Sequence, residues 1–249
     1  MSVTALPDAT AAGPGDPVEA ERASRKAAVA ATLRLFAQLG YEFGFNGHIT
    51  VRDPGPGDLY WANPWGVPFA VTTASDLVLV DCEGTVLEGR HPTSQAGFRS
   101  THVLHYARPD ATAVVHVHSP YGFTWSSSPR LLEPVNTDAA LLHGLQAVHD
   151  DFGRPDGKST ADSLGPTARV LIQRSHGFVT IGESVEEAAF YFMAAERAAH
   201  GQLLLAAAGR GELVADELRA KWTLTPQTAR DHFAPHLRQI LHDHPEVSQ

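Results

Sequence analysis

Apolar positions recur along this chain with two periods, and the longer one marks its helices. Apolar residues spaced three and four apart predict four helices: residues 20–39, residues 95–108, residues 184–208 and a C-terminal helix that starts at Thr225. Gly40 ends the first helix, and Ser184 and Glu187 have the spacing of a capping box at the start of the third. Pro226 suits the first turn of the last helix, whereas Pro235 predicts that this helix ends or bends there.

Short runs rich in β-branched and aromatic residues predict strands between these helices. Before residue 90 they read HITVRD, DLYWAN, DLVLVD and TVLEG, and turn sequences such as DPGPGD separate them. Farther along, ATAVVHV is one apolar strand, and two more flank the Ser-His-Gly break in VLIQRSHGFVTIG. Residues 131–145 predict a strand with a short helix, and the polar residues 150–165 predict a surface loop.

Strands interspersed with helices predict an α/β domain, and the length fits a single one. The 249 residues suffice to bury a full core. Residues 1–19 are rich in alanine, proline, glycine and aspartate without periodicity, which predicts a mobile tail. Residues 20–249 are then one domain with a helical C-terminal segment.

The net charge and the cysteine content indicate which kinds of binding partner and which cellular compartment to expect. The formal net charge of −9 disfavours binding to nucleic acid or to an anionic membrane, because both repel an acidic protein. The one cysteine, Cys82, excludes an internal disulfide and is typical of a reducing compartment. The sequence has neither a leader pattern nor an apolar run of about 18 residues. We therefore expect a cytoplasmic protein.

Candidate metal ligands lie in the strand ATAVVHVHS. His116 and His118 are two residues apart, so in a strand their rings project to the same side, about 7 Å apart along the backbone. His176, in the Ser-His-Gly break, is a third candidate, and three neutral imidazoles with an open position are typical of a catalytic metal site. His102 and His105 share one face of a predicted helix and are either further site residues or packed side chains.

Longer motifs around these histidines resemble the class II aldolase/adducin-head family. They are PTSQAGFRSTHVLHYARPDATAVVHVHSPYG and SHGFVTIGESVEEAAFYFMAAERAAHGQL, preceded by GHITVRDP and NPWGVPFAVTTASDLVLVD, and the resemblance spans residues 24–208. It implies a three-layer α/β/α domain with a mostly antiparallel central sheet, assembled as a homo-oligomer, in the family a tetramer. It also implies one divalent ion per chain (zinc, iron(II), manganese or cobalt), bound by His116, His118 and His176.

Departures from the family's sugar-phosphate aldolases bear on the reaction. Where those enzymes have Ser-Ser-Glu, this chain has Thr93, Ser94 and Gln95, and the amide of Gln95 has no titratable oxygen with which to act as a general base. Where they bind phosphate with Gly-Asn-x-Ser, this chain has an imidazole at His48. Ordinary aldol cleavage and a phosphorylated sugar are both disfavoured. Asp76, in a Ser-Asp-Leu motif, joins Thr93 and Ser94 as a candidate for substrate binding.

The sequence supports one leading function and two alternatives. The first is a metal-dependent lyase that acts on a small anionic, carboxylated or hydroxylated substrate, by decarboxylation or retro-aldol cleavage, with decarboxylation favoured because it starts without a base. Gln95 then contacts substrate or metal, and Tyr121 or His48 protonates the product. The second is a non-haem iron(II) oxygenase of secondary metabolism at the same histidines. The third is a non-enzymatic, adducin-like binding module.

Overall fold

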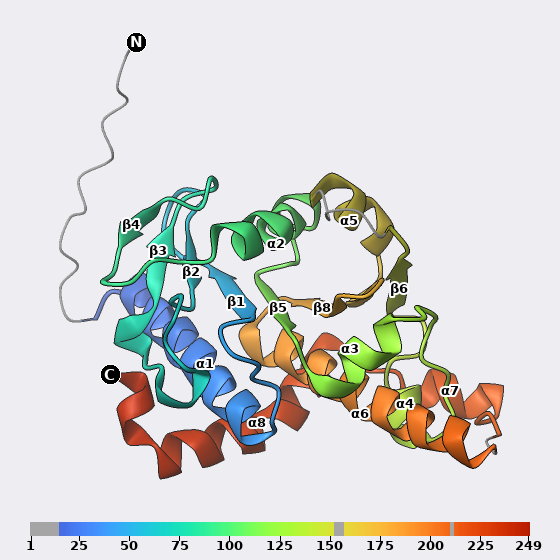
Figure 1. Cartoon of the computed structure of the whole chain (residues 1–249). Coiled ribbons are helices and arrows are strands. Elements are labelled where there is room, and N and C mark those ends of the chain that lie inside the picture. The colour runs from blue at the N-terminus through green and yellow to red at the C-terminus, as the bar shows by residue number, and fades with distance from the viewer. Residues whose placement is uncertain (1–14, 152–156, 210–211) are drawn as a thin grey trace.

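The computed structural model describes residues 15–151, 157–209 and 212–249 (Figure 1). Its α-helices are α1 Pro17–Gln38, α2 Gln95–Ala107, α3 Pro120–Ser126, α4 Thr137–Ala140, α5 Gly157–Leu164, α6 Val185–Ala208, α7 Asp216–Trp222 and α8 Pro226–Asp243. Its short 3-10 helices are η1 Phe69–Val71, η2 Ala74–Asp76 and η3 Pro245–Ser248. Its strands are β1 Gly47–Arg52, β2 Tyr60–Ala62, β3 Val78–Val80, β4 Val86–Glu88, β5 Ala113–Val117, β6 Gln146–His149, β7 Val170–Gln173 and β8 Gly177–Gly182. None of the helices within these ranges is long and apolar enough to cross a membrane.

The described strands form one sheet of eight, in the order β4-β3-β2-β1-β5-β8-β7-β6. Every neighbouring pair is antiparallel except β6 and β7, which are parallel. The prediction of a mostly antiparallel central sheet is confirmed. β5 lies at the centre of this order, between β1 and β8.

Helices cover both faces of the sheet and give the predicted three layers. On one face α2 packs against α5, and on the other α6 packs against α8 and α1 (Figure 1). Three hydrophobic clusters of buried residues are found in the described structure, and the two that contact β5 lie on opposite faces of the sheet. Leu104 of α2 and Leu164 of α5 cluster with Val114 of β5, whereas Phe192 of α6 belongs to the larger cluster with Val115.

The central strand β5 alternates between these two cores. Ala113, Val115 and Val117 belong to the core under α6, and Val114 belongs to the core under α2. Because successive side chains of a strand point to opposite faces, His116 projects to the same side as Val114. The apolar pattern of β5 therefore directs His116 toward the α2 layer.

Two predicted segments differ from the structure. Residues 150–165 were expected to be a loop, but residues 157–164 form α5; residues 152–156 lie outside the described ranges. The sequence of α5 is mostly polar, and the helix is stabilised by packing against α2, where Leu164 is buried. The strand expected within residues 131–145 is also wrong, since α4 lies there and β6 begins only at Gln146.

The predicted helices need two corrections and two additions. The first helix begins at Pro17, so residues 17–19 are helical, while most of the predicted tail lies outside the described residues. α8 continues through Pro235 to Asp243, so the predicted end at this proline is wrong; Phe233 and Ile240, buried on both sides of the proline, hold the helix against the core. Two short helices were not predicted: α3, which begins two residues after His118, and α7.

One buried carboxylate joins α1 to the sheet. Asp53, 5% exposed, accepts hydrogen bonds from Arg22 of α1 at 2.6 and 2.9 Å, from the Trp61 indole at 2.7 Å and from the Gly55 amide at 2.8 Å. Burial alone raises the pKa of Asp53, but these hydrogen bonds outweigh it and hold the pKa below its usual value. The ionised carboxylate is therefore the form that stabilises the fold.

We expect Asp53→Asn to lower the free energy of unfolding by about 2 kcal/mol at pH 7, since it removes a charged acceptor from three donors. The contribution is present above the unfolded pKa of about 3.9 and is lost as the pH falls through the lower folded pKa. Urea unfolding should therefore give the same difference between variant and wild type at pH 7 and pH 5, and a smaller one below about pH 4. Asp58→Asn, which removes an exposed partner of Arg52, is the control and should change little. An equal loss in both variants would contradict the assignment.

Candidate metal centre

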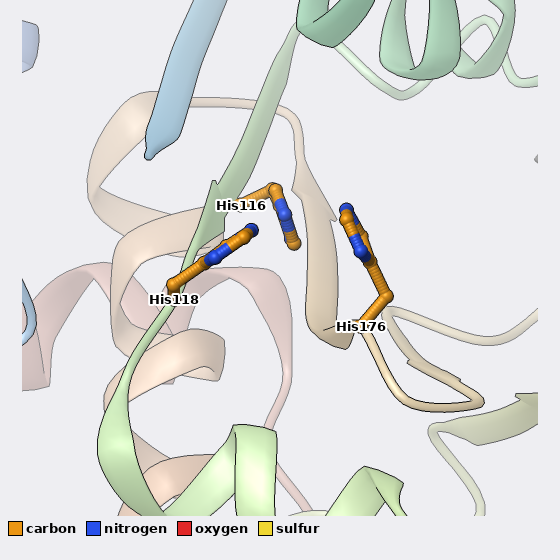
Figure 2. A group of neighbouring side chains, drawn as sticks. All are labelled: His116, His118 and His176. Atoms are coloured by element: carbon orange, nitrogen blue, oxygen red, sulfur yellow. The ribbon is translucent and has the colours of Figure 1, made fainter. Parts of the chain in front are cut away.

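Three histidines from two segments converge beside the end of β5. His116 lies in β5, His118 follows the end of that strand, and His176 lies in the turn between β7 and β8 (Figure 2). One ring nitrogen from each lies within 4.8 Å of the others. The ring centroids are 4.9 to 5.2 Å apart, and the rings of His116 and His176 are nearly parallel.

Tight backbone geometry places His176 in this group. β7 and β8 are joined by residues 174–176, and Ser175 has a φ of 55°. Within the described ranges it is the only non-glycine residue with a positive φ. Such a conformation costs on the order of 1 kcal/mol and is found preferentially at functional sites. Gly177, with a φ of 87°, completes the turn.

Hydrogen bonding and burial prepare His116 to donate a lone pair. Its Nδ1 donates to the backbone carbonyl of Phe178 at 2.8 Å, which leaves Nε2 as the unprotonated nitrogen. Nε2 is buried and has no hydrogen-bond partner in the described structure. Burial lowers the pKa of His116 far below its usual value, and it lowers the pKa of His118 to about 4 with a further effect from His176. The pKa of His176 is lowered by burial as well.

These features fit a divalent cation. The three imidazoles are neutral at pH 7, which is the form that binds metal. The Phe178 carbonyl fixes the tautomer of His116, as outer hydrogen bonds do for histidine ligands in general. Without a metal, the buried Nε2 of His116 would be a polar atom left without compensation.

A fourth imidazole borders the group. His48 of β1 lies directly opposite His116 in the strand register, and the two ring centroids are 5.1 Å apart. Burial, with smaller effects from His176 and His118, lowers the pKa of His48 to about 3, and its Nε2 is buried without a partner. Because the His48 ring is neutral near pH 7, it is better suited to hydrogen-bond a bound molecule than to act as an acid, which would require the protonated imidazolium.

The N-terminus of α2 lies against His48. Ser94 is the N-cap, and its hydroxyl accepts a hydrogen bond from the Gly97 amide at 3.2 Å. A Cβ at Gly97 would lie 2.7 Å from Nδ1 of His48, so only glycine permits this approach. Thr93 directly precedes the cap, and Gln95 is the first helical residue, with its side chain outside the described part of the structure.

Two other predicted site residues make contacts elsewhere. The ring of Tyr121 stacks on His200 of α6, with centroids 3.8 Å apart. Asp76 caps η2 by accepting from the Thr73 amide at 3.0 Å, and it pairs with Arg90 at 3.2 Å. Among the ring and hydrogen-bond contacts of the described residues, neither side chain contacts the three histidines. Their roles in proton transfer and substrate binding stay predictions.

His105, one of the two histidines left open on α2, has structural partners. Its Nε2 shares a hydrogen bond with the Thr50 hydroxyl at 2.9 Å, and its Nδ1 bonds the Ala111 carbonyl. Both ring nitrogens are thus used inside the core between α2 and the sheet. His102 stacks on Phe98 of the same helix, with centroids 5.1 Å apart. Structural contacts account for the His105 ring, whereas the buried Nδ1 of His102 has no hydrogen-bond partner among the described residues.

Residues around α3 were missed by the sequence analysis. The ring centroids of Phe123 and His118 are 4.6 Å apart, and the Ser126 hydroxyl accepts a hydrogen bond from the turn that carries His176. Glu196 of α6 is 1% exposed, and its carboxylate accepts hydrogen bonds from residues just after His118. An acidic residue within the apolar sequence FMAAERAA was the available signal for Glu196, since a charge on a buried helix face needs a partner.

Comparison with known proteins gives the same fold. The chain is 38% identical over 204 residues to decarboxylase NovR of Streptomyces niveus, covering 79% of this chain and 75% of that protein. It is 37% identical over 219 residues to a 4-hydroxy-3-prenylphenylpyruvate oxygenase/4-hydroxy-3-prenylbenzoate synthase of Streptomyces roseochromogenus subsp. oscitans, covering 85% and 78%. The solved L-fuculose 1-phosphate aldolase of Glaciozyma antarctica PI12 superposes with a TM-score of 0.89 at 32% identity, covering 96% and 97% of the two chains.

The family assignment predicted from the motifs is confirmed. The model of the class II aldolase and adducin N-terminal domain matches residues 27–203, which span the sheet and both metal-centre segments. The residues matched include β1, α2, β5 and the start of α6. The chain belongs to the class II aldolase and adducin N-terminal domain family.

Proposed function

We propose that this protein is a divalent-metal-dependent lyase acting on a small carboxylated or hydroxylated substrate, most simply by decarboxylation. One observation carries the proposal: three neutral imidazoles gather at 4.8 Å or less, and the buried Nε2 of His116 among them has no partner in the described structure. His116, His118 and His176 would bind the ion. When bound there, it supplies positive charge that attracts an anionic substrate and stabilises negative charge developing on the neighbouring carbon.

The surrounding side chains favour decarboxylation over aldol cleavage. Aldol cleavage begins with removal of a hydroxyl proton, and the amide of Gln95 cannot accept one. Loss of carbon dioxide begins without a base. Neutral His48, which pairs with His116 in the strand register, would hydrogen-bond a polar group of the substrate, and Thr93 and Ser94 at the start of α2 would bind it as well. The proton that replaces the carboxyl group reaches the product from water or from Tyr121.

A second function, oxygenation with iron(II), is favoured by one specific relative. The protein of Streptomyces roseochromogenus subsp. oscitans with 37% identity is named an oxygenase. Imidazole ligands suit iron as well as zinc, manganese or cobalt, so the ligand set by itself does not choose between the reactions. The same name contains a phenylpyruvate, which makes aromatic 2-oxo acids the first substrates to test for either reaction.

Assembly and a non-enzymatic role stay predictions. Phe43, Phe45 and Trp65 are exposed apolar residues near the start of β1, which suits a subunit contact in a homo-oligomer. Sedimentation velocity of the purified chain measures the assembly. An adducin-like binding module without metal is the remaining alternative, because the family also contains adducins.

We expect the purified protein to bind one divalent ion per chain, and His116→Ala, His118→Ala and His176→Ala each to weaken binding at least tenfold, because two imidazoles hold an ion poorly. Zinc affinity measured by competition with a chromophoric chelator, together with elemental analysis, tests this. His242→Ala removes an exposed histidine of α8 and is the matched control. Full zinc occupancy in all three site variants would exclude the assignment, and an unmodified protein that binds no metal would favour the adducin-like alternative.

Cleavage of fuculose- or ribulose-type sugar phosphates should be absent or very slow in the unmodified protein, because the Gln95 amide cannot accept and return a proton and His48 replaces an amide in the phosphate motif. A coupled assay for dihydroxyacetone phosphate measures it. The similarity to a solved structure named L-fuculose 1-phosphate aldolase makes this the necessary comparison. Rapid release by the unmodified protein would refute the prediction, whereas activity gained in Gln95→Glu would identify the missing proton carrier.

The two proposed enzymatic reactions differ in whether they require oxygen. We expect protein purified without oxygen to convert one member of a panel of 2-oxo, 2-hydroxy and dihydroxyaromatic acids anaerobically, with zinc, manganese or cobalt bound, because a lyase needs no change in oxidation state. Product and dissolved oxygen are measured together, with and without air. Turnover that requires iron(II) and consumes oxygen in proportion to product would reverse the ranking in favour of the oxygenase.

A further inference from the structure

A buried carboxylate on α6 binds the segment that follows His118. Glu196 accepts hydrogen bonds from the Ser119 hydroxyl at 2.7 Å, from the Tyr121 amide at 2.8 Å and from the Gly122 amide at 2.7 Å. All three partners are donors, so the ionised carboxylate satisfies them together. Burial raises the pKa of Glu196, and these hydrogen bonds oppose that effect.

These bonds fix the start of α3. The first amides of a helix have no partner within it, and an N-cap side chain usually supplies one. Ser119 is the N-cap of α3 but makes no capping bond; its hydroxyl donates to Glu196 instead. The carboxylate of Glu196 thus caps α3 from a different helix, one residue after His118.

The other end of α3 holds the turn that carries His176. The carbonyl of Ser126 accepts from the Ser175 amide at 2.8 Å, and the hydroxyl of Ser126 accepts from the Gly177 amide at 2.9 Å. Between the two ends, the ring of Phe123 lies 4.6 Å from that of His118 and 6.2 Å from that of His176. α3 is therefore a short rigid connection between two of the three histidines.

Close packing leaves α3 little freedom to move relative to β8 and α6. A Cβ at Gly122 would lie 2.7 Å from the Phe178 ring and 2.9 Å from the Glu196 carboxylate, so the backbone of α3 approaches both as closely as glycine allows. Phe178 is also the residue whose carbonyl orients His116. One packed unit thus contacts the segments of all three histidines.

We propose that Glu196 is a positioning residue of the metal centre: through its hydrogen bonds to α3 it sets the separation of His118 and His176. This inference rests on the proposed function, because it takes the three histidines as metal ligands. Glu196 touches no substrate and acts only through α3. Removing one or more of its hydrogen bonds keeps all three histidine side chains in the protein but allows the segments that carry His118 and His176 to move apart. Outer residues of this kind commonly change metal affinity by 10- to 100-fold.

The experiment compares two buried carboxylates of the same helix. Glu196→Gln keeps the shape but replaces one acceptor oxygen with a donor, next to groups that are all donors. Glu187→Gln is the matched control, since Glu187 is also buried in α6 and accepts a backbone amide, from Glu183, but lies about 13 Å away along the helix. Ser119→Ala removes a single bond to Glu196 and serves as a milder variant in case Glu196→Gln folds poorly.

We expect zinc binding, measured by chelator competition, to weaken at least tenfold in Glu196→Gln and by a smaller factor in Ser119→Ala, and to be unchanged in Glu187→Gln. The visible absorption of the cobalt(II)-loaded protein should change in the first two variants and not in the third. Thermal unfolding without metal gives each variant's loss of stability for comparison. Unchanged zinc affinity and cobalt spectrum in Glu196→Gln would overturn the inference while leaving the metal site intact, as would an equal loss of affinity in Glu187→Gln. Absence of zinc binding in the unmodified protein would overturn the proposed metal site and this inference with it.

Discussion

The register of β5 between β1 and β8 is the constraint on which the site depends. His116 pairs with His48 on one side and with Val179 on the other. A shift by one residue would turn every side chain of β5 to the opposite face, so His116 would enter the large core under α6 and Val115 would replace it at the site. The apolar residues that make β5 a buried strand therefore also direct the ligand. Selection for a stable core and selection for the metal site act on the same register.

The two histidines outside β5, His118 and His176, are held by hydrogen bonds to a neighbouring helix and not by strand pairing. His118 lies beyond the last hydrogen bond of β5, and His176 lies in a turn, so neither is held by the sheet ladder. Hydrogen bonds to α3 hold both, from Glu196 at one end and to Ser126 at the other. The positive φ of Ser175 is consistent with this, because such a conformation persists where neighbouring bonds determine it. The candidate site thus combines one histidine on a rigid strand with two histidines on segments that a short helix holds.

The sequence predicted what depends on periodic burial. The helices over residues 95–108 and 184–208, the strand that contains His116, and the family all follow from apolar spacing or from long motifs, and each is confirmed. α3 and α5 were missed, because helices of seven and eight residues have little stability of their own and form here through contacts with α6 and α2. The contacts of Tyr121 and Glu196 with residues far along the chain could not be predicted either. They depend on where α6 lies in space, and the local spacing of apolar residues carries no information about that.

Charge at the site connects the fold to the class of substrate. The side chains that converge there are imidazoles, and their low pKa values keep them neutral. The neighbouring His48 is neutral for the same reason. The position after Ser94 is an amide, Gln95, where sugar-phosphate aldolases of the family have a carboxylate. A neutral set of side chains does not compensate a divalent ion, whereas a glutamate at that position would cancel half of its charge. If an ion binds there as proposed, its full charge would be available to an anionic substrate, and in a site partly shielded from water such an attraction would be far stronger than in solution. In the proposed lyase, this change from acid to amide would remove the base that aldol cleavage needs and would leave more of the ion's charge for a substrate carboxylate, which is the reason for proposing decarboxylation.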